Sequence, residues 1–280
     1  MSHIWGVTER TSGADLPEMD PGLASLYARG VESTRLTRVP LELERNKAIL
    51  AERLPSSGRI IDAGGGTGVY SAWLAERGYQ VDLVEPIPLH VEQARQVASQ
   101  GAAFKAHLGD ARKLEFPDGV ADAVLLMGPL YCLVEAHDRE RALSEALRVL
   151  RPGGVLAAAA LGRLISYLQS VAQNRIRWPG VIESMMSEIE TGAMRSGSVT
   201  LYTHRPEELR DEIANAGFSD VEILGITGSF LGITDIGERL ADPTSKEALL
   251  DAMRRVEADP GIVGISGKLM AVARRPPQAH

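Results

Sequence analysis

The sequence predicts an α/β fold in which helices cover both faces of a mostly parallel sheet. Between about residues 58 and 160, short apolar segments alternate with segments whose apolar residues have helical spacing. Such alternation is typical of parallel sheets, whose strands are buried on both faces and therefore form nearly continuous apolar runs. A chain of 280 residues, 44% of them hydrophobic and 24% charged, is long enough to bury the core that this sheet needs.

Seven segments have the length and composition of strands. Each is short and mostly apolar, as buried strands are. Five lie in the alternating region and two follow near the end of the chain, at 59–63, 80–85, 102–108, 121–127, 154–160, 220–227 and 268–274. We expect them to form one seven-stranded, mostly parallel sheet.

Helices are expected between these strands. One helical face stops at Gly78 and another at Gly101, because glycine commonly ends helices. Asp138 is placed to cap a third helix. Residues 203–218 predict a fourth, and the segment that begins at Thr244, with Glu247 at capping-box spacing, predicts a helix inserted between the last two strands.

Two segments fall outside this alternation and are expected to cover one end of the sheet. The second of them predicts helices that are broken at Pro179 and Gly180, since proline interrupts a helix. The chain therefore divides into an N-terminal helical lid, a ligand-binding core, a helical lid insertion and the C-terminal part of the core sheet, at residues 1–45, 46–161, 162–200 and 201–280.

Composition and charge exclude several classes of function. No apolar run reaches the roughly 18 residues of a membrane span, and the first residues lack the features of a signal peptide. A single cysteine, Cys132, excludes an internal disulfide and a multi-thiolate metal site, and the His and acidic residues show no metal-ligand spacing. A net charge of −7 provides no attraction to nucleic acid. We expect a soluble cytoplasmic protein without metal, membrane or nucleic-acid partners.

The stretch IIDAGGGTGVYS, residues 60–71, is the strongest functional signal. A strand that enters four glycines and then a helix creates a tight turn whose backbone can approach a ligand closely. A dinucleotide fingerprint requires a third glycine where this chain has Val69, and no Gly-Lys-Ser/Thr of a phosphate-binding loop follows. Asp62 is an acid within an otherwise apolar strand, which requires a specific partner.

The segment DAGGGTG resembles the first motif of the class I S-adenosylmethionine-dependent methyltransferases, and the likeness covers residues 41–275. It implies a Rossmann-like, doubly wound α/β fold with a helical lid, and S-adenosylmethionine as the cofactor. In that family the glycine turn approaches the methionine part of the cofactor, while the acid fixes the turn and helps to orient the amino group.

Further motifs match the family at the expected intervals. Glu85 ends the second strand, as does the acid that accepts hydrogen bonds from the ribose hydroxyls, and Asp110 follows the third strand, as does the acid that binds the adenine amino group. In the family, the residue after this acid offers its backbone N–H to the adenine ring, and in this chain that residue is Ala111. The cofactor contacts that the resemblance implies are Asp62, Ala63, Gly64, Gly66, Gly68, Glu85, Asp110, Ala111 and Met127.

Other interpretations of these residues remain open. Asp110 is also suited to cap a helix, and Glu85 is also suited to a solvated strand end. Because Glu85 lies near the spacing of a dinucleotide ribose acid as well, an NAD(P)-dependent oxidoreductase is one alternative. A non-catalytic S-adenosylmethionine-binding protein is another, since fold does not establish function.

The segment LLMGPLYCLVE, after the fourth strand, bears on the methyl acceptor. The Asn/Asp-Pro-Pro-aromatic motif of enzymes that methylate amide or base nitrogens is absent. GPLYCL instead resembles GPLYHL of a bacterial subgroup of small-molecule methyltransferases, with Cys132 in place of histidine. We therefore expect methyl transfer to an O, N or C nucleophile of a small organic molecule, with no oligomeric state predicted.

Few residues are candidates for catalysis or for binding the acceptor. His204 precedes a helix near the expected cavity and is a candidate base, although a capping role fits equally. Tyr131 is a candidate for orienting the acceptor, and a packing role is the alternative. Tyr27 and Arg35 are candidate acceptor contacts on the N-terminal lid, with Glu32, Arg175 and Arg177 as further polar candidates that exposed helix faces would also explain.

Overall fold

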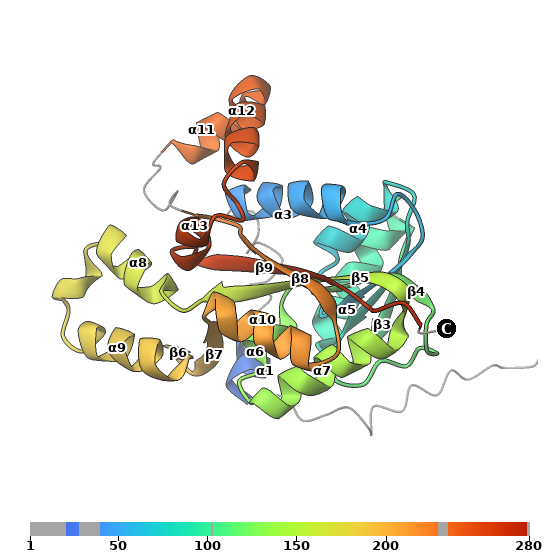
Figure 1. The fold of residues 1–280 in the computed structure, drawn as a ribbon, viewed down its shortest axis with the longest axis horizontal. Coiled ribbons are helices and arrows are strands. Elements are labelled where there is room, and N and C mark those ends of the chain that lie inside the picture. Colours follow the sequence, from blue (N-terminus) through green and yellow to red (C-terminus); the bar gives the residue numbers. More distant parts are fainter. Residues whose placement is uncertain (1–20, 28–39, 102, 229–234, 279–280) are drawn as a thin grey trace, which may run out of the picture.

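The computed structural model describes residues 21–27, 40–101, 103–228 and 235–278. Within them the chain forms a nine-stranded sheet with helices on both faces (Figure 1). The strands are β1 (Arg59–Ala63), β2 (Gln80–Glu85), β3 (Lys105–Leu108), β4 (Ala121–Leu126), β5 (Leu150–Gly162), β6 (Ala193–Ser196), β7 (Val199–His204), β8 (Ser219–Gly225) and β9 (Lys268–Arg274). No helix of this described part has both the length and the apolar character to cross a membrane.

The seven strands expected from the sequence lie side by side in the order β3–β2–β1–β4–β5–β9–β8. Strands β1 to β5 pair in parallel, and β9 runs antiparallel between β5 and β8. The predicted fold class is therefore confirmed. Because β1 is followed in space by β2 on one side and β4 on the other, the chain reverses its direction of winding at β1. In open α/β sheets, ligands bind at such a switch point.

Helices cover the two faces in separate groups. The α-helices of the described residues, those of the insertions included, are α1 (Pro21–Tyr27), α3 (Pro40–Arg53), α4 (Val69–Ala75), α5 (Pro88–Ser99), α6 (Pro129–Cys132), α7 (Ala136–Val149), α8 (Ile165–Ala172), α9 (Val181–Thr191), α10 (Pro206–Asn215), α11 (Ile236–Ala241), α12 (Pro243–Arg254) and α13 (Pro260–Gly264). In Figure 1, α3 and α4 lie above the sheet and α7 and α10 below it.

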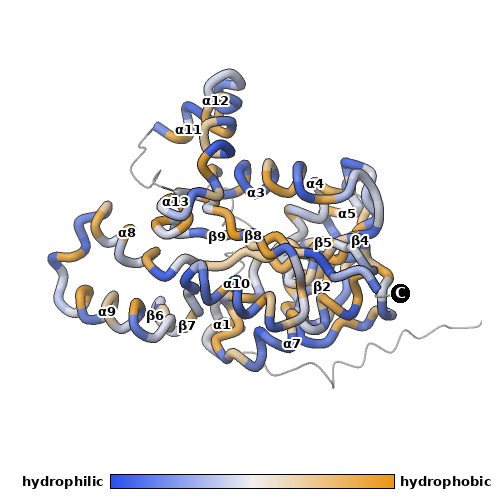
Figure 2. Tube along the Cα trace, viewed as in Figure 1, coloured by the Kyte–Doolittle hydropathy of each residue, from blue (hydrophilic) through white to orange (hydrophobic). Residues whose placement is uncertain are grey.

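Alternation along the strands divides the core into two apolar layers. Ile60, Leu125 and Ala157 face the layer that α3, α4 and α5 complete, whereas Ile61, Val124 and Leu156 face the layer that α7 and α10 complete. Figure 2 shows hydrophobic residues concentrated in the central strands and mixed stretches on the helices. Each fully buried aliphatic side chain stabilises the fold by about 1.5–3 kcal/mol, so the two layers together hold the sheet in place.

Several predicted boundaries and caps are wrong. β3 begins at Lys105 rather than at 102, and β5 begins at Leu150 rather than at 154, because Leu150 already pairs with Ala121 before a bulge. Asp138 does not cap α7: Glu135 occupies the cap position, and Asp138 accepts a hydrogen bond from Arg112 Nη1 at 2.7 Å.

Two later helices also start elsewhere than predicted. α10 begins at Pro206 rather than at 203, since Thr203 and His204 belong to β7. α12 is capped by Asp242, whose carboxylate accepts the Ser245 N–H at 2.8 Å, and not by Thr244. In both helices proline occupies the first turn, where its missing N–H costs nothing.

The insertion between β5 and α10 projects from the core as an arm (Figure 1). Its helices α8 and α9 are separated at the predicted Pro179–Gly180 break, with a short 3-10 helix, η3 (Arg175–Arg177), before it. The hairpin β6–β7 was not predicted, and β7 extends the sheet by pairing with the end of β5. Large apolar side chains are exposed along the arm at Tyr167, Val171, Ile176, Trp178, Ile182 and Met186.

A buried ion pair fastens the C-terminal insertion to the core. Arg45 of α3 donates through Nη2 to Glu257 Oε2 at 2.7 Å, and the two side chains are 1% and 6% exposed. Arg53 donates to the other oxygen of Glu257 at 3.3 Å. An unpaired charge at this depth would be strongly unfavourable, so each partner depends on the other.

We expect Glu257→Gln to lower the free energy of unfolding by about 3 kcal/mol, because it leaves Arg45 as a buried charge without its counter-ion. Denaturant unfolding of the two proteins measures the difference. Asp251→Asn is the matched control, since Asp251 pairs with Arg255 at the surface, where such a pair contributes little to stability. Equal effects of the two variants would contradict the role of Glu257 as the buried counter-ion of Arg45.

Candidate functional site

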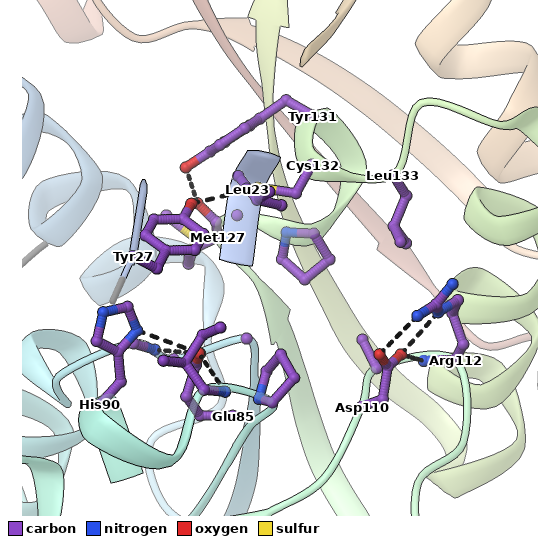
Figure 3. A pocket seen from close by; sticks show the side chains of 18 of the residues that line it. Leu23, Tyr27, Glu85, His90, Asp110, Arg112, Met127, Tyr131, Cys132 and Leu133 are labelled. Atoms are coloured by element: carbon purple, nitrogen blue, oxygen red, sulfur yellow. Dashed lines mark hydrogen bonds and ion pairs between the residues drawn. The ribbon is translucent and has the colours of Figure 1, made fainter. Parts of the chain in front are cut away.

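A cavity of about 310 Å³ lies at the carboxyl ends of the central parallel strands (Figure 3). Its lining consists of residues 64–67 after β1, 85–87 after β2, 110–112 after β3 and 127–129 with 131–135 after β4, joined by Leu23, Tyr27, Val69, Tyr70, His90 and Asp138. The volume falls in the range of small-molecule sites. The position is the one that the switch point of the sheet predicts.

The glycine turn after β1 forms one wall because side chains would not fit there. Gly64 has a φ of 75°, and a Cβ atom at this position would come within 2.6 Å of Pro129 Cγ. The N–H groups of Gly64 and Gly65 donate to Val84 O at 2.7 and 3.3 Å, which joins the turn to β2. The turn after β1 is thus hydrogen-bonded to β2 and packed directly against the residues that follow β4.

Asp62 lies beneath this turn and does not line the cavity. It is fully buried, and Ser71 Oγ donates to its Oδ2 at 2.7 Å, whereas Oδ1 has no hydrogen-bond partner. Burial raises the pKa of Asp62 to about 6, the Ser71 hydrogen bond opposes this rise, and the nearby charge of Glu85 adds to it. The Asp62 carboxyl group therefore makes its hydrogen bond within the protein, to Ser71 of α4, and not across the cavity.

Glu85 points toward the cavity from the end of β2. Its Oε2 accepts the Gly66 N–H at 3.0 Å and its Oε1 accepts the Ile87 N–H at 3.1 Å. These bonds tie the carboxylate to the glycine turn and to the start of α5. A carboxylate has about four acceptor positions, so Glu85 keeps acceptor capacity on Oε2 for a ligand.

Asp110 and its neighbour Ala111 form the opposite wall. Arg112 donates to both carboxylate oxygens of Asp110, at 3.0 and 2.9 Å, and its backbone N–H donates to Oδ1 at 2.8 Å. The hydrogen bonds that Arg112 donates to Asp110 raise the pKa of the Arg112 guanidinium against the effect of its burial. Asp110 is thus held rigidly, and not as the helix cap that was the alternative.

The roof of the cavity comes from α1 and α6. Leu23 and Tyr27 of α1 line it, and the Tyr27 hydroxyl lies 3.4 Å from Cys132 Sγ. Tyr131, which is 8% exposed, donates from its hydroxyl to Met127 O at 3.3 Å, and the Lys268 ammonium lies 5.1 Å from its ring centre.

The structure brings together eight of the residues predicted from the sequence, namely Tyr27, Gly64, Gly66, Glu85, Asp110, Ala111, Met127 and Tyr131. Ala63 and Gly68 lie beside the cavity in β1 and at the cap of α4 without lining it. Arg35 and Glu32 lie outside the described residues. Among the described lining residues none comes from 162–200, so the insertion, with Arg175 and Arg177, does not form the wall expected of a lid.

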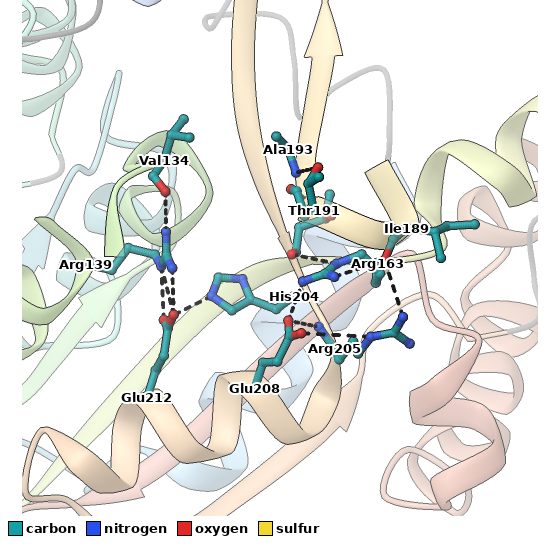
Figure 4. Close-up of polar contacts among 12 residues, drawn as sticks. Val134, Arg139, Arg163, Ile189, Thr191, Ala193, His204, Arg205, Glu208 and Glu212 are labelled. Carbon is teal, nitrogen blue, oxygen red and sulfur yellow. Dashed lines mark hydrogen bonds and ion pairs between the residues drawn. The ribbon is translucent and has the colours of Figure 1, made fainter. Parts of the chain in front are cut away.

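His204 is not at the cavity, which corrects its placement from the sequence. It is fully buried in β7, and its Nε2 lies 3.1 Å from Glu212 Oε2 (Figure 4). Its ring packs edge-on against Tyr202. Burial lowers the pKa of His204, although Glu212 opposes the change. Burial alone would raise the pKa of Glu212, but hydrogen bonds from His204 and Arg139 lower it to about 2.

This buried network reaches the cavity through Arg139. Its Nη1 donates to the carbonyls of Leu133 and Val134, at 3.0 and 2.6 Å, and both residues line the cavity. Arg139 also binds both oxygens of Glu212 (Figure 4). Sequence reasoning missed Arg139 and also His90, which lines the cavity beside Glu85. In the part of the chain that the structure describes, no group of three or more His, Cys, Asp or Glu side chains is arranged to hold a metal.

Comparison with known proteins identifies relatives of the core. A family described as "Methyltransferase domain" matches residues 60–154. A demethylmenaquinone methyltransferase of Deinococcus radiodurans is 32% identical over 190 residues, which are 66% of this chain and 75% of that protein. An S-adenosyl-L-methionine-dependent Diels-Alderase of Talaromyces variabilis is 30% identical over 185 residues, 64% of this chain and 59% of that protein.

Other matches cover less of the relative or show the fold alone. An uncharacterized methyltransferase of Mycobacterium tuberculosis is 38% identical over 104 residues, 37% of this chain, and the match spans only 40% of the length of that relative. A SAM-dependent methyltransferase of Methanosarcina mazei superposes with a TM-score of 0.57 at 18% identity, over 82% of this chain and 98% of that one.

The raised pKa of Asp62 has a consequence for stability. Because the folded-state pKa of about 6 exceeds the unfolded value of about 3.9, the folded chain favours the protonated acid, and this contribution is lost as the pH rises through 6. Relative to Asp62→Asn, the native chain should therefore lose about 2 to 3 kcal/mol of unfolding free energy between about pH 4 and pH 7.5. Denaturant unfolding at both pH values tests this, and a constant difference would contradict it.

Proposed function

Because the chain belongs to the S-adenosylmethionine-dependent methyltransferases, we propose that it transfers the methyl group of S-adenosylmethionine to an O, N or C nucleophile of a small organic molecule. The observation that carries this proposal is the cavity at the switch point, where the glycine turn, Glu85 and Asp110 face one another across the ends of β1, β2 and β3. For each of these three features, the resemblance to the family implies a contact with the cofactor.

The residues at the cavity fit the cofactor in shape and chemistry. Gly64 and Gly66 leave the backbone of the turn open to a ligand, with φ values of 75° and 58°. Glu85 has an acceptor position free for a ribose hydroxyl, and Asp110 and the Ala111 backbone lie where an adenine ring would be bound. Met127 contributes an apolar surface between these groups.

The chain's own contribution to the reaction is placement and exclusion of water. When bound, S-adenosylmethionine supplies a methyl group that its sulfonium already activates. Tyr131 and Cys132 on α6 and Tyr27 on α1 would enclose the acceptor beside that methyl group, which converts a bimolecular encounter into a positioned one. Tyr131 is the proposed orienting residue, and no base is assigned, since His204 lies in the interior.

A small acceptor is supported by three features. Leu23 and Tyr27 of α1 cover part of the cavity, the net charge of −7 does not attract phosphate, and the GPLY segment resembles that of a subgroup with small substrates. The Deinococcus radiodurans relative is named for demethylmenaquinone, which is also a small organic molecule. A cytoplasmic location and a lid role of the N-terminal segment, residues 1–45, belong to the same proposal, since Leu23 and Tyr27 line the cavity.

One relative supports a second candidate function. The Talaromyces variabilis protein is named as an S-adenosyl-L-methionine-dependent Diels-Alderase, so a related core is associated with a reaction other than methyl transfer. In that case the cavity would bind the cofactor without consuming it. The two functions differ in whether S-adenosylhomocysteine is formed.

We expect radiolabelled methyl groups from S-adenosylmethionine to appear in small molecules when the protein is incubated with metabolite extract, and not in RNA, DNA or protein fractions. S-adenosylhomocysteine should form in equal amount. Label in the macromolecular fractions would overturn the small-molecule acceptor. The second function would be favoured if the protein bound S-adenosylmethionine but formed no S-adenosylhomocysteine in extracts in which related methyltransferases find a methyl acceptor.

We expect Glu85→Gln to weaken S-adenosylhomocysteine binding by about tenfold to a hundredfold, because hydrogen bonds to a charged acceptor contribute about 1.5–3 kcal/mol. The substitution keeps the shape of the side chain but replaces one acceptor oxygen by an NH2 group, which cannot accept the N–H that it faces, so the melting temperature should fall as well. Titration calorimetry measures the affinity. Glu92→Gln, an exposed change on α5, is the control, and an affinity loss as large as that of Glu85→Gln would refute the assignment.

A further inference from the structure

The imidazole of His90 lies against the Glu85 carboxylate at one end of the cavity. Its Nδ1 is 3.2 Å from Glu85 Oε1, and the residue is 1% exposed (Figure 3). His90 is in the first turn of α5, which begins after Ile87, and Ile87 donates its N–H to the same oxygen. One turn of helix thus supplies two of the three donors that surround Glu85.

The contact fixes the tautomer of the ring. A carboxylate oxygen accepts hydrogen bonds, so the hydrogen between the two groups lies on Nδ1. Nε2 is then the bare nitrogen, and it is buried without a hydrogen-bond partner. Because Glu85 is the one polar group that the ring contacts among the described hydrogen bonds, His90 is oriented by this carboxylate and in turn restricts it.

His90 also supports the roof. The ring of Tyr27 packs edge-on against the imidazole, with centroids 5.2 Å apart and planes at 69°. The hydroxyl of the same tyrosine lies 3.4 Å from Cys132 Sγ on α6. Tyr27 therefore joins α1 to His90 on one side of the cavity and to α6 on the other, as Figure 3 shows.

We propose that His90 is a positioning residue that holds Glu85 for the cofactor ribose and links the seating of α1 to cofactor binding. This inference rests on the proposed function. With Gly66 N–H on Oε2 and both Ile87 N–H and His90 Nδ1–H on Oε1, the carboxylate cannot rotate, and the acceptor position left on Oε2 faces the ligand. Loss of the Nδ1 donor frees the rotation, and loss of the imidazole ring removes the surface on which Tyr27 packs.

Two isosteric variants separate this role from packing. An asparagine amide can occupy the place of Nδ1, whereas a glutamine amide extends to the place of Nε2. His90→Asn should therefore bind S-adenosylhomocysteine within about threefold of the native chain, while His90→Gln and His90→Leu should bind about tenfold more weakly, as loss of a hydrogen bond to a charged group predicts. Equal weakening by Asn and Leu would overturn the proposal, as would full affinity of Gln.

The link to α1 is tested by a double-mutant cycle. Tyr27→Ala should weaken S-adenosylhomocysteine binding in the native background and have little further effect in His90→Leu, because the surface it packs on is already lost. Additive effects would show that Tyr27 acts independently of His90 and would overturn this part. Tyr27→Phe, which keeps the ring, should retain the coupling.

The tautomer is read in the native chain, and a variant is needed only to assign the His90 signals. Two-bond nitrogen–hydrogen NMR correlations, with His90 assigned by its absence in His90→Asn, should show Nδ1–H and a bare Nε2 near neutral pH. A protonated Nε2 with a bare Nδ1 would overturn the proposal. If the native chain bound neither S-adenosylmethionine nor S-adenosylhomocysteine, the proposed function would fail instead, whatever the tautomer.

Discussion

The Glu85 carboxylate fixes the ends of neighbouring strands relative to one another, and the cavity depends on that constraint. It accepts a hydrogen bond from the turn after β1 and another from the residue before α5, so two separate strand-to-helix connections share one acceptor. Gly64 completes the arrangement by allowing Pro129, after β4, to approach the same turn. A displaced carboxylate would therefore disturb three strand ends at once.

The constraint also explains why an acid is buried beneath the turn. Asp62 carries a raised pKa because only Ser71 compensates for its burial and because the charge of Glu85 is near. Evolved sites retain such unfavourable groups where the surrounding structure determines their position. Two acids at the ends of adjacent strands make the region negative, which suits a cofactor that carries a positive sulfonium and an ammonium group.

Local patterns were sufficient to predict seven of the nine strands and to place Glu85 and Asp110 at strand ends beside the cavity. The limits of β1, β2 and β9 follow from apolar runs between turn residues, and Glu85 and Asp110 follow from their places at strand ends. The sheet order of β9 between β5 and β8 depends on long-range pairing, which no local pattern encodes. The hairpin β6–β7 was missed because only helices were predicted for the insertion, although the glycine turn in AMRSGSVTLYTH, at Gly197, is a local signal for it.

The errors in the site have a different physical origin. His204 and His90 are both buried and both contact a glutamate, but β7 carries the first into the interior and α5 carries the second to the cavity. A histidine's neighbours across the fold decide its role, and spacing along the chain does not contain them. His90 was the less conspicuous of the two, although its position five residues after a strand-end acid places it on the first turn of the next helix, where its ring can reach back to that acid.

The two halves of the cavity are built on different principles, and this division bears on how one fold serves many acceptors. The proposed cofactor half consists of strand ends and backbone amides that the core holds rigidly, with Asp110 fixed by Arg112 and Glu85 by its three donors. The proposed acceptor half consists of side chains on α1, α6 and residues 133–135, which meet the core through contacts such as Arg139 with Leu133 O and Val134 O. Substitutions in this second half change the shape of the cavity without altering the strand ends, so acceptor specificity can diverge while the cofactor site is maintained.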